Sequence, residues 1–262
     1  MDYIKTNKAA WEEAFNNRRP SWGEDVHLRL KSEKYAYFNA DMRAVLNEID
    51  LKGKTIAQFC CNNGRELLSL LDSGANAAFG FDIAENIISQ AQETAQKAGI
   101  TNCTFTACDI LEIPTQYHGQ FDFIMFTIGA ITWFEDLIVL FEKASLCLKP
   151  GGQLLIHDSH PLINMLPVPG ETEFDSQELN RLAYSYFRKE PWLENSGMGY
   201  ISGKYESRTF TSFSHTLSSI INTLAINGIR IVRFDEFDYD IGITNVYDGK
   251  GFPLSYILVA SK

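Results

Sequence analysis

The chain has 262 residues, and its 33 acidic residues outnumber its 23 lysines and arginines, which gives a net charge of −10. This length suits one large α/β domain or one domain that carries an insertion. The acidic balance argues against a general nucleic-acid binder, because such proteins need clustered cations to displace counterions from the phosphates, and no such cluster is present.

The sequence also lacks the marks of a secreted or membrane protein. It contains no stretch of about 18 uninterrupted apolar residues, and it does not begin with a basic segment followed by an apolar one. Its five cysteines are odd in number and include the adjacent pair Cys60 and Cys61, which fits neither a disulfide framework nor a CxxC metal pattern. We therefore expect reduced thiols, a cytoplasmic location and no membrane partner.

Short apolar runs alternate with longer segments of helical spacing, which is typical of βαβ units and a mostly parallel sheet. The predicted strands cover residues 55–60, 77–81, 103–107, 121–126, 153–157, 229–234 and 254–260. The predicted helices cover residues 64–71, 84–98, 135–148 and 215–227, and residues 1–53 have an amphipathic helical pattern. This order predicts an α/β fold with a doubly wound, mostly parallel, seven-stranded sheet.

Residues 159–214 interrupt the rhythm of strands and helices. They contain four of the eight prolines and several aromatic residues, without a clean βα repeat. We therefore expect an insertion after the fifth strand that packs over one end of the sheet.

The turn after the first predicted strand is the first candidate for a ligand site. In an open α/β sheet the ligand binds beyond the carboxyl ends of the strands, where the strand order reverses. Residues 59–64 read FCCNNG, and the helix that follows can present free main-chain N–H groups to an oxygen-rich ligand. Alone this signal is weak, since a glycine before a helix is ordinary turn chemistry.

Two acidic residues at the next strand ends strengthen the signal. Asp82 ends the second predicted strand 18 residues beyond Gly64, close to the spacing at which a carboxylate accepts from ribose hydroxyls. Asp109 follows the third strand, where it can accept from an adenine amine while Ile110 packs on the ring. Either aspartate alone could simply cap a helix, but two at consecutive strand ends favour a nucleotide-like ligand.

The stretch 54–158 resembles the core of the class I S-adenosylmethionine-dependent methyltransferases. The resemblance depends on the acidic residues after strands two and three, on the strand FDFIMF and on the turn LKPGG before strand five, its most specific element. Residues 215–262 match more loosely. The resemblance implies a Rossmann-like methyltransferase domain over 54–262, with 1–53 as an N-terminal helical cover and 159–214 as a lid on the acceptor side.

The first loop departs from the family pattern. The family usually has an acidic residue and then a GxGxG loop, whereas this chain has Gln58 in place of the acid and Cys60 and Asn62 in place of two glycines. A side chain at either glycine position changes how closely the methionine end of a cofactor approaches the main chain. The loop is similar to that of a bacterial subgroup in which only the last glycine is kept.

The resemblance implies S-adenosylmethionine as cofactor and S-adenosylhomocysteine as product. In it, residues 60–64 line the methionine, Asp82 holds the ribose, Ile83 packs on the adenine, Asp109 binds its amine, and residues 126–129 pass beneath the sulfonium. The predicted cofactor-binding residues are Phe59, Cys60, Cys61, Asn62, Asn63, Gly64, Asp82, Ile83, Cys108, Asp109, Ile110, Phe126, Thr127 and Gly129. Methyl transfer is an in-line displacement, so the protein chiefly aligns the reactants and excludes water.

The end of the fifth predicted strand offers candidates for a general base, which is useful only if the acceptor must lose a proton. His157, Asp158 and His160 all lie there, and Asp158 and His160 are the predicted catalytic residues. His160 precedes Pro161 and is therefore extended, so its ring can point at an acceptor; alternatively, it is a hydrogen-bonded structural histidine. No metal site is expected, because three ligands within four residues at a strand end rarely converge.

On the acceptor side we expect Trp133, which follows the fourth strand, and Tyr37. Most other N-terminal aromatic residues are expected in the core. The insertion adds aromatic side chains that suit a small, partly apolar acceptor, namely Phe174, Tyr184, Tyr186, Phe187, Trp192, Tyr200 and Tyr205. A nucleic-acid partner is not expected.

Function is thus predicted as methyl transfer by an enzyme to an unidentified small molecule. The substituted loop leaves open a second interpretation, a regulatory module that binds the cofactor without transferring the methyl group. A nicotinamide dehydrogenase is disfavoured, because the loop lacks GxGxxG and LKPGG has no role there. The sequence leaves the acceptor and the oligomeric state open, and fold alone does not separate these functions.

Overall fold

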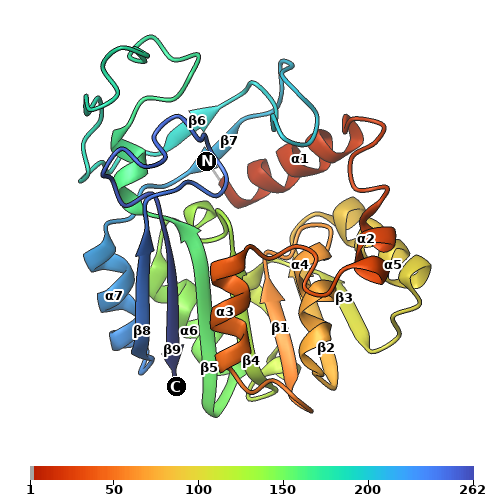
Figure 1. The fold of residues 1–262 in the computed structure, drawn as a ribbon. Helices are drawn as coiled ribbons and strands as arrows, with labels where there is room; N and C mark the ends of the chain where they lie inside the picture. The colour runs from red at the N-terminus through yellow and green to blue at the C-terminus, as the bar shows by residue number, and fades with distance from the viewer. Residues whose placement is uncertain (1–2) are drawn as a thin grey trace.

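The computed structural model describes residues 3–262, and its centre is a seven-stranded sheet of order β3-β2-β1-β4-β5-β9-β8 (Figure 1). The strands are β1 (Thr55–Phe59), β2 (Ala77–Asp82), β3 (Cys103–Ala107), β4 (Phe121–Thr127), β5 (Leu148–Ser159), β8 (Arg230–Phe237) and β9 (Ser255–Ser261). Strands β1 to β5 pair in parallel, whereas β9 runs antiparallel to β5 and β8. The predicted α/β class and its mostly parallel sheet are confirmed, and the strand order reverses between β1 and β4.

The predicted helices are present, and their ends differ from the prediction by at most two residues. They are α4 (Arg65–Leu70), α5 (Glu85–Ala98), α6 (Leu137–Cys147) and α7 (Leu217–Ile226). The shifts reflect capping: Asp136 accepts hydrogen bonds from the N–H groups of Ile138 and Val139, so α6 begins after it rather than at Glu135. At the C-terminal end of α5, Gly99 adopts φ 77° and stops the helix as expected.

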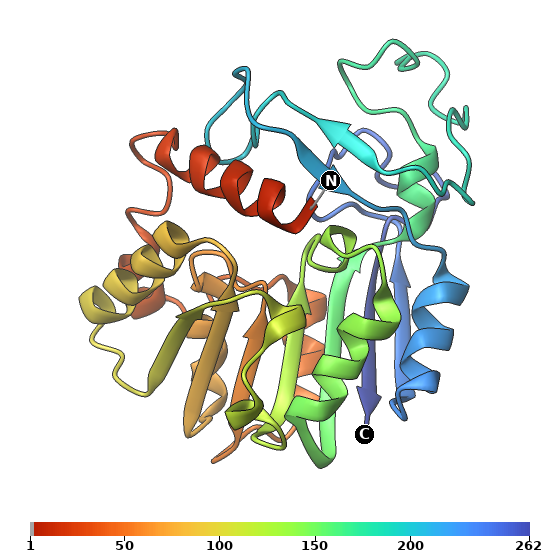
Figure 2. The same ribbon diagram turned by 180° about the vertical axis from the view of Figure 1, so that it is seen from behind.

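Helices cover both faces of the sheet, as a doubly wound fold requires. Leu140 and Phe141 of α6 and Leu224 of α7 pack in one buried cluster with the sheet, on the face seen in Figure 2. Buried side chains of α4 and α5 pack against the other face. No helix within residues 3–262 is long and apolar enough to cross a membrane.

The N-terminal stretch 1–53 divides between two places. Its helices are α1 (Tyr3–Asn16), α2 (Val26–Ser32) and α3 (Ala40–Glu48). Met42, Val45 and Leu46 of α3 are buried in the core cluster on the face of the sheet. In contrast, α1 lies across the edge where the parallel strands end (Figure 1). Residues 1–2 lie outside the described residues.

The insertion 159–214, like α1, lies over the carboxyl ends of the parallel strands (Figure 1). It begins with a short 3-10 helix and contains a two-stranded antiparallel ribbon of β6 (Trp192–Glu194) and β7 (Phe210–Ser212). A reciprocal pair of hydrogen bonds joins the Asn7 side chain in α1 to the main chain of Thr211 in β7, at 2.8 and 2.7 Å. Helix α1 and the ribbon are therefore fastened together over the carboxyl ends of the strands.

Close packing around Gly80 in β2, beside the first loop, predicts that an added side chain destabilises the protein. A Cβ atom there would lie 2.5 Å from a Phe105 ring carbon and 2.9 Å from the sulfur of Cys61. We expect Gly80→Ala to lower the free energy of unfolding by about 1–3 kcal/mol, because the overpacked ring must shift. Gly199→Ala is the control, since no atom lies within 4 Å of its added Cβ. Equal urea midpoints for the two variants would contradict the expectation.

Candidate functional site

The loop after β1 has an unusual backbone. Cys60, Asn62 and Gly64 all have positive φ angles, of 57°, 50° and 74°. This conformation is routine for glycine and tolerated by asparagine, but it strains a cysteine. A Cβ atom at Gly64 would lie 2.5 Å from the Phe105 ring, so glycine is required there on two grounds. The loop thus keeps the conformation favoured by glycine at three alternate positions while two of them carry side chains.

Asp82, at the end of β2, is bonded to this loop. Its carboxylate accepts hydrogen bonds from the N–H groups of Asn62 at 2.8 Å and Ala84 at 3.1 Å. Burial raises the pKa of Asp82 even though these N–H groups hold it down. The carboxylate is therefore incompletely compensated, and its remaining lone pairs suit further donors such as a pair of hydroxyl groups.

Asp109 caps the 3-10 helix that follows β3. Its side chain accepts a hydrogen bond from the N–H of Leu111 at 2.9 Å. Ile110 is buried in the same core cluster as Phe126 and Ile124. The capping role considered for Asp109 is thus present.

The Cys60 thiol lies in the electrostatic field of carboxylates from several strand ends. Burial raises the pKa of this thiol well above its usual value, and the neighbouring carboxylates of Asp82, Asp109 and Asp158 raise it further. No cation lowers it, so Cys60 is a neutral thiol rather than a nucleophile. Carboxylates from three separate strand ends therefore act on the same thiol.

Gln58 and Thr127 join the ends of β1 and β4. The buried Gln58 amide donates to the Thr127 hydroxyl at 2.6 Å, while its Oε1 atom has no hydrogen-bond partner. The neighbouring Gly129, with φ 77°, donates its N–H to Asp158 at 2.6 Å. The segment after β4 is thus fixed both to β1 and to the end of β5.

Asp158 has one engaged and one free carboxylate oxygen. Oδ1 accepts from the N–H groups of Gly129 and Ser159, whereas Oδ2 is buried without a partner. Burial raises the pKa of Asp158 to about 6, although the main-chain bonds oppose this shift. The tyrosine opposite in β9, Tyr256, has a buried hydroxyl that is also without a partner.

His160 is held at Nδ1 and faces a carboxylate at Nε2. Nδ1 accepts from the N–H of Leu162 at 3.1 Å and caps the 3-10 helix. Nε2 lies 3.0 Å from a carboxylate oxygen of Glu236 in β8, although the two atoms are not aligned as a hydrogen bond. Burial lowers the pKa of His157 to about 4. Within residues 3–262, no three His, Cys, Asp or Glu side chains are grouped so that they could hold a metal ion.

The two predicted acceptor-side residues have different surroundings. Trp133 packs edge-on against Trp11 of α1 with ring centroids 5.2 Å apart, and it also contacts Phe210 of β7. The Tyr37 ring lies between the guanidinium groups of Arg29 and Arg65, at 4.6 and 5.5 Å. Trp133 therefore connects the sheet to α1 and the ribbon, while Tyr37 lies beside the start of α4.

Tyr200 is one of the seven insertion aromatics expected on the acceptor side, and the structure places it at the loop after β1. Its hydroxyl accepts a hydrogen bond from the Asn62 side-chain amide at 3.3 Å. Its ring lies 6.5 Å from that of Trp22. The aromatic composition of the insertion put Tyr200 on the acceptor side with six others, but nothing in the sequence indicated its contact with Asn62.

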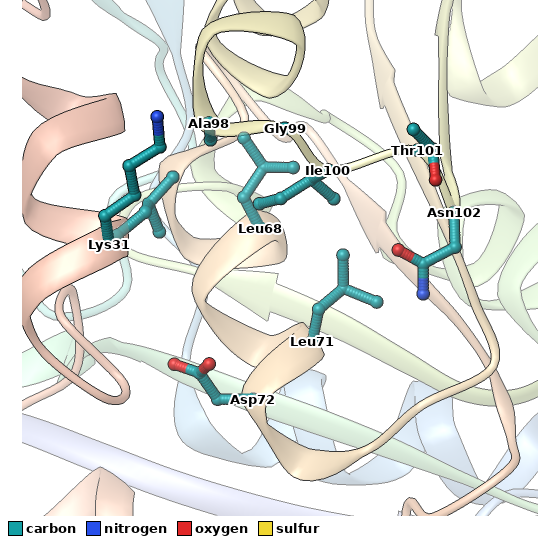
Figure 3. Close-up of a pocket in the computed structure, with 10 residues that line it drawn as sticks. Lys31, Leu68, Leu71, Asp72, Ala98, Gly99, Ile100, Thr101 and Asn102 are labelled. Carbon is teal, nitrogen blue, oxygen red and sulfur yellow. The ribbon is translucent and has the colours of Figure 1, made fainter.

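Two surface hollows lie apart from these residues. One of about 310 Å³ is bounded by Leu68, Leu71 and Ile100 among others (Figure 3). The second, of about 480 Å³, lies between α3 and β8 and is lined by Asp41 and Phe234. Neither is lined by a predicted site residue, so the candidate site is defined by the convergence of side chains at the strand ends.

Comparison with known protein sequences gives one family and several distant relatives. A family model described as a methyltransferase domain matches residues 50–201. An uncharacterized protein of Haemophilus influenzae is 25% identical over 194 residues, 71% of each chain. A tRNA U34 carboxymethyltransferase of Campylobacter curvus is 24% identical over 133 residues, 51% of this chain and 42% of that protein.

Solved structures share the fold over most of their length. An S-adenosylmethionine-dependent methyltransferase of Mesorhizobium loti has a TM-score of 0.63 and 19% identity, over 86% of this chain and 99% of that one. A geranyl diphosphate C-methyltransferase of Streptomyces coelicolor, solved with S-adenosylhomocysteine, has a TM-score of 0.62 and 11% identity, over 100% and 98% of the two chains. At these identities the likeness establishes the architecture.

Because the backbone at Cys60 is strained, we expect glycine to be tolerated better than alanine at this position, the reverse of the usual order. We expect Cys60→Gly to be more stable than Cys60→Ala by about 1 kcal/mol, because only glycine relieves the left-handed strain. At Cys108, which lacks a positive φ, alanine should be the more stable by about 0.4–1 kcal/mol, since glycine adds freedom to the unfolded chain. Chemical denaturation of the four variants measures both differences, and the same order at both positions would contradict the strain.

The raised pKa of Asp158 predicts a pH-dependent stability. Its folded pKa of about 6 exceeds the ordinary value of 3.8, so its favourable contribution is present at low pH and is lost as the pH rises through 6. Asp158→Asn keeps an acceptor oxygen and does not titrate. We expect the stability of this variant relative to the wild type to increase by about 2 kcal/mol from about pH 4 to about pH 7.5. A constant difference in urea titrations would show that Asp158 titrates normally.

Proposed function

The chain belongs to the class I S-adenosylmethionine-dependent methyltransferases, and from this premise we propose that it methylates a small molecule held beneath α1 and the β6–β7 ribbon. S-adenosylmethionine is the methyl donor of this enzyme. One observation carries the proposal: the carboxyl ends of the strands are covered by segments that reach down to the cofactor loop, where Tyr200 accepts a hydrogen bond from Asn62. Such a cover favours an acceptor small enough to be enclosed.

The residues at the strand ends fit this cofactor. When bound, S-adenosylmethionine supplies an electrophilic methyl group on a positively charged sulfur. Asp82 would hold the ribose hydroxyls with its buried, incompletely compensated carboxylate, and Asp109, at the end of β3, would accept from the adenine amine. Residues 60–64 would hold the methionine chain, and the segment from Phe126 to Gly129, which is fixed by Gln58 and Asp158, would lie beside the sulfur.

Charge argues for an acceptor that is not a polyanion. Asp82, Asp109 and Asp158 are all close enough to Cys60 to raise the pKa of its thiol. A nucleic acid would bring phosphates toward these carboxylates, on a chain whose net charge is already −10. The tRNA-modifying relative matches 51% of this chain and 42% of its own length.

Asp158 is the stronger candidate for a general base if the acceptor must lose a proton. Its free Oδ2 atom can accept that proton, and a pKa of about 6 leaves most of the carboxylate ionised at neutral pH. The Nδ1 atom of His160 already caps the 3-10 helix and its Nε2 atom faces the Glu236 carboxylate, which favours the structural role. We place the reaction in the cytoplasm, where five free thiols remain reduced.

The acceptor class is tested by incubating the enzyme with methyl-labelled S-adenosylmethionine and either a small-metabolite extract or total tRNA. We expect label in small molecules and none in tRNA, and labelled tRNA would overturn the proposal. Binding of S-adenosylhomocysteine in calorimetry without any labelled product would favour the regulatory module instead.

Cofactor binding itself is tested with Asp82→Asn. We expect its affinity for S-adenosylhomocysteine to fall at least about tenfold, because charged hydrogen bonds to the ribose are lost. The control is Asp122→Asn, whose carboxylate pairs with Lys149 at the opposite end of the sheet; its affinity should stay within about twofold of the wild type. Unchanged affinity in Asp82→Asn would remove Asp82 from the ribose site.

A further inference from the structure

The chain between β6 and β7 reaches from the cover down to the cofactor loop. We call residues 195–209 the hairpin tip; it lies beside α1 (Figure 1). It is a folded unit, since the N–H groups of Tyr205 and Ser207 bond to the carbonyls of Ser196 and Asn195 at 3.1 and 2.9 Å. From this unit, Tyr200 extends to the Asn62 amide.

The N-terminal segment holds the other side of the hairpin tip. The Arg19 N–H donates to the Ile201 carbonyl at 2.9 Å, and its guanidinium donates to the Gly199 carbonyl at 3.0 Å. The Trp22 ring packs near the Tyr200 ring. Tyr200 is therefore held from two sides, by residues that connect α1 to α2 and by the cofactor loop.

Asn62 can join the cofactor loop to the hairpin tip because three of its atoms form hydrogen bonds. Its main-chain N–H binds Asp82, its Oδ1 accepts from the Asn63 N–H at 2.7 Å, and its Nδ2 donates to Tyr200. The second bond fixes the orientation of the amide, so that its nitrogen faces the hairpin tip. A glycine at this position would keep the backbone and the bond to Asp82 but could not reach Tyr200.

We propose that Asn62 is a positioning residue that latches the hairpin tip onto the cofactor loop, so that cofactor exchange requires the Asn62–Tyr200 bond to break. This inference rests on the proposed function, and it explains why a side chain replaces glycine at position 62 in spite of the left-handed backbone. The bond itself joins protein to protein. Weakening it therefore changes how fast the ligand enters and leaves more than how tightly it is held.

The test measures association and dissociation of S-adenosylhomocysteine with the full-length enzyme by stopped-flow fluorescence. For Tyr200→Phe we expect both rate constants to rise by about two- to tenfold, the worth of one hydrogen bond, with the dissociation constant within about twofold of the wild type. Asn62→Gly should raise dissociation by a similar factor, and the double variant should be no faster than the faster single variant, because both lose the same bond.

The matched control is Tyr205→Phe, in the same hairpin tip. The hydroxyl that it removes has no hydrogen-bond partner. Its rate constants should equal those of the wild type. Unchanged rates in Tyr200→Phe, an additive double variant, or an equal acceleration in Tyr205→Phe would each overturn the latch. A loss of affinity with unchanged association would also overturn it, since Tyr200 would then hold the ligand directly. These measurements need no acceptor, so they are independent of whether a small molecule is methylated.

Discussion

The structure of the site depends on the way the first loop is bonded to the end of β2. The N–H of Cys61 bonds to the carbonyl of Phe81 at 2.9 Å, and the next N–H, of Asn62, bonds to the Asp82 carboxylate at 2.8 Å. These bonds form only when the loop curls back toward β2, which the positive φ angles at 60, 62 and 64 allow. Strain in the loop is thus balanced by two hydrogen bonds, one of them to a buried charge.

The parts of this arrangement that follow from local sequence could be predicted. Strand β2 is a short apolar run that ends in an aspartate, so Asp82 had to lie at the carboxyl edge once the strands were parallel. Gly64 precedes a helix and proved indispensable there because the Phe105 ring fills the space of a side chain. The helix ends were less certain by a residue or two, since caps such as Asp136 also look like first helical residues.

The parts that could not be predicted depend on contacts between distant residues. His160 was expected to be extended, and it is, but the partner of its Nε2 atom is Glu236, which comes from an edge strand far along the chain. Tyr200 reaches Asn62 across 138 residues, and the insertion around it has no periodicity that would reveal its direction. Helix α3 has the same amphipathic pattern as α1, yet α3 packs on the face of the sheet while α1 crosses its edge.

The candidate site is acidic, as is the chain as a whole, whose net charge is −10. Arg65, at the start of α4, is already paired with Glu66 at 2.7 Å, so it does little to offset the carboxylates that act on Cys60. Such a site attracts the sulfonium of S-adenosylmethionine and has no comparable attraction for the neutral sulfur of the product. Methyl transfer removes the positive charge of the sulfur, so this attraction is lost after the reaction. In the proposed function the same negative field disfavours anionic acceptors, so the charge at the strand ends bears on the donor and on the acceptor alike.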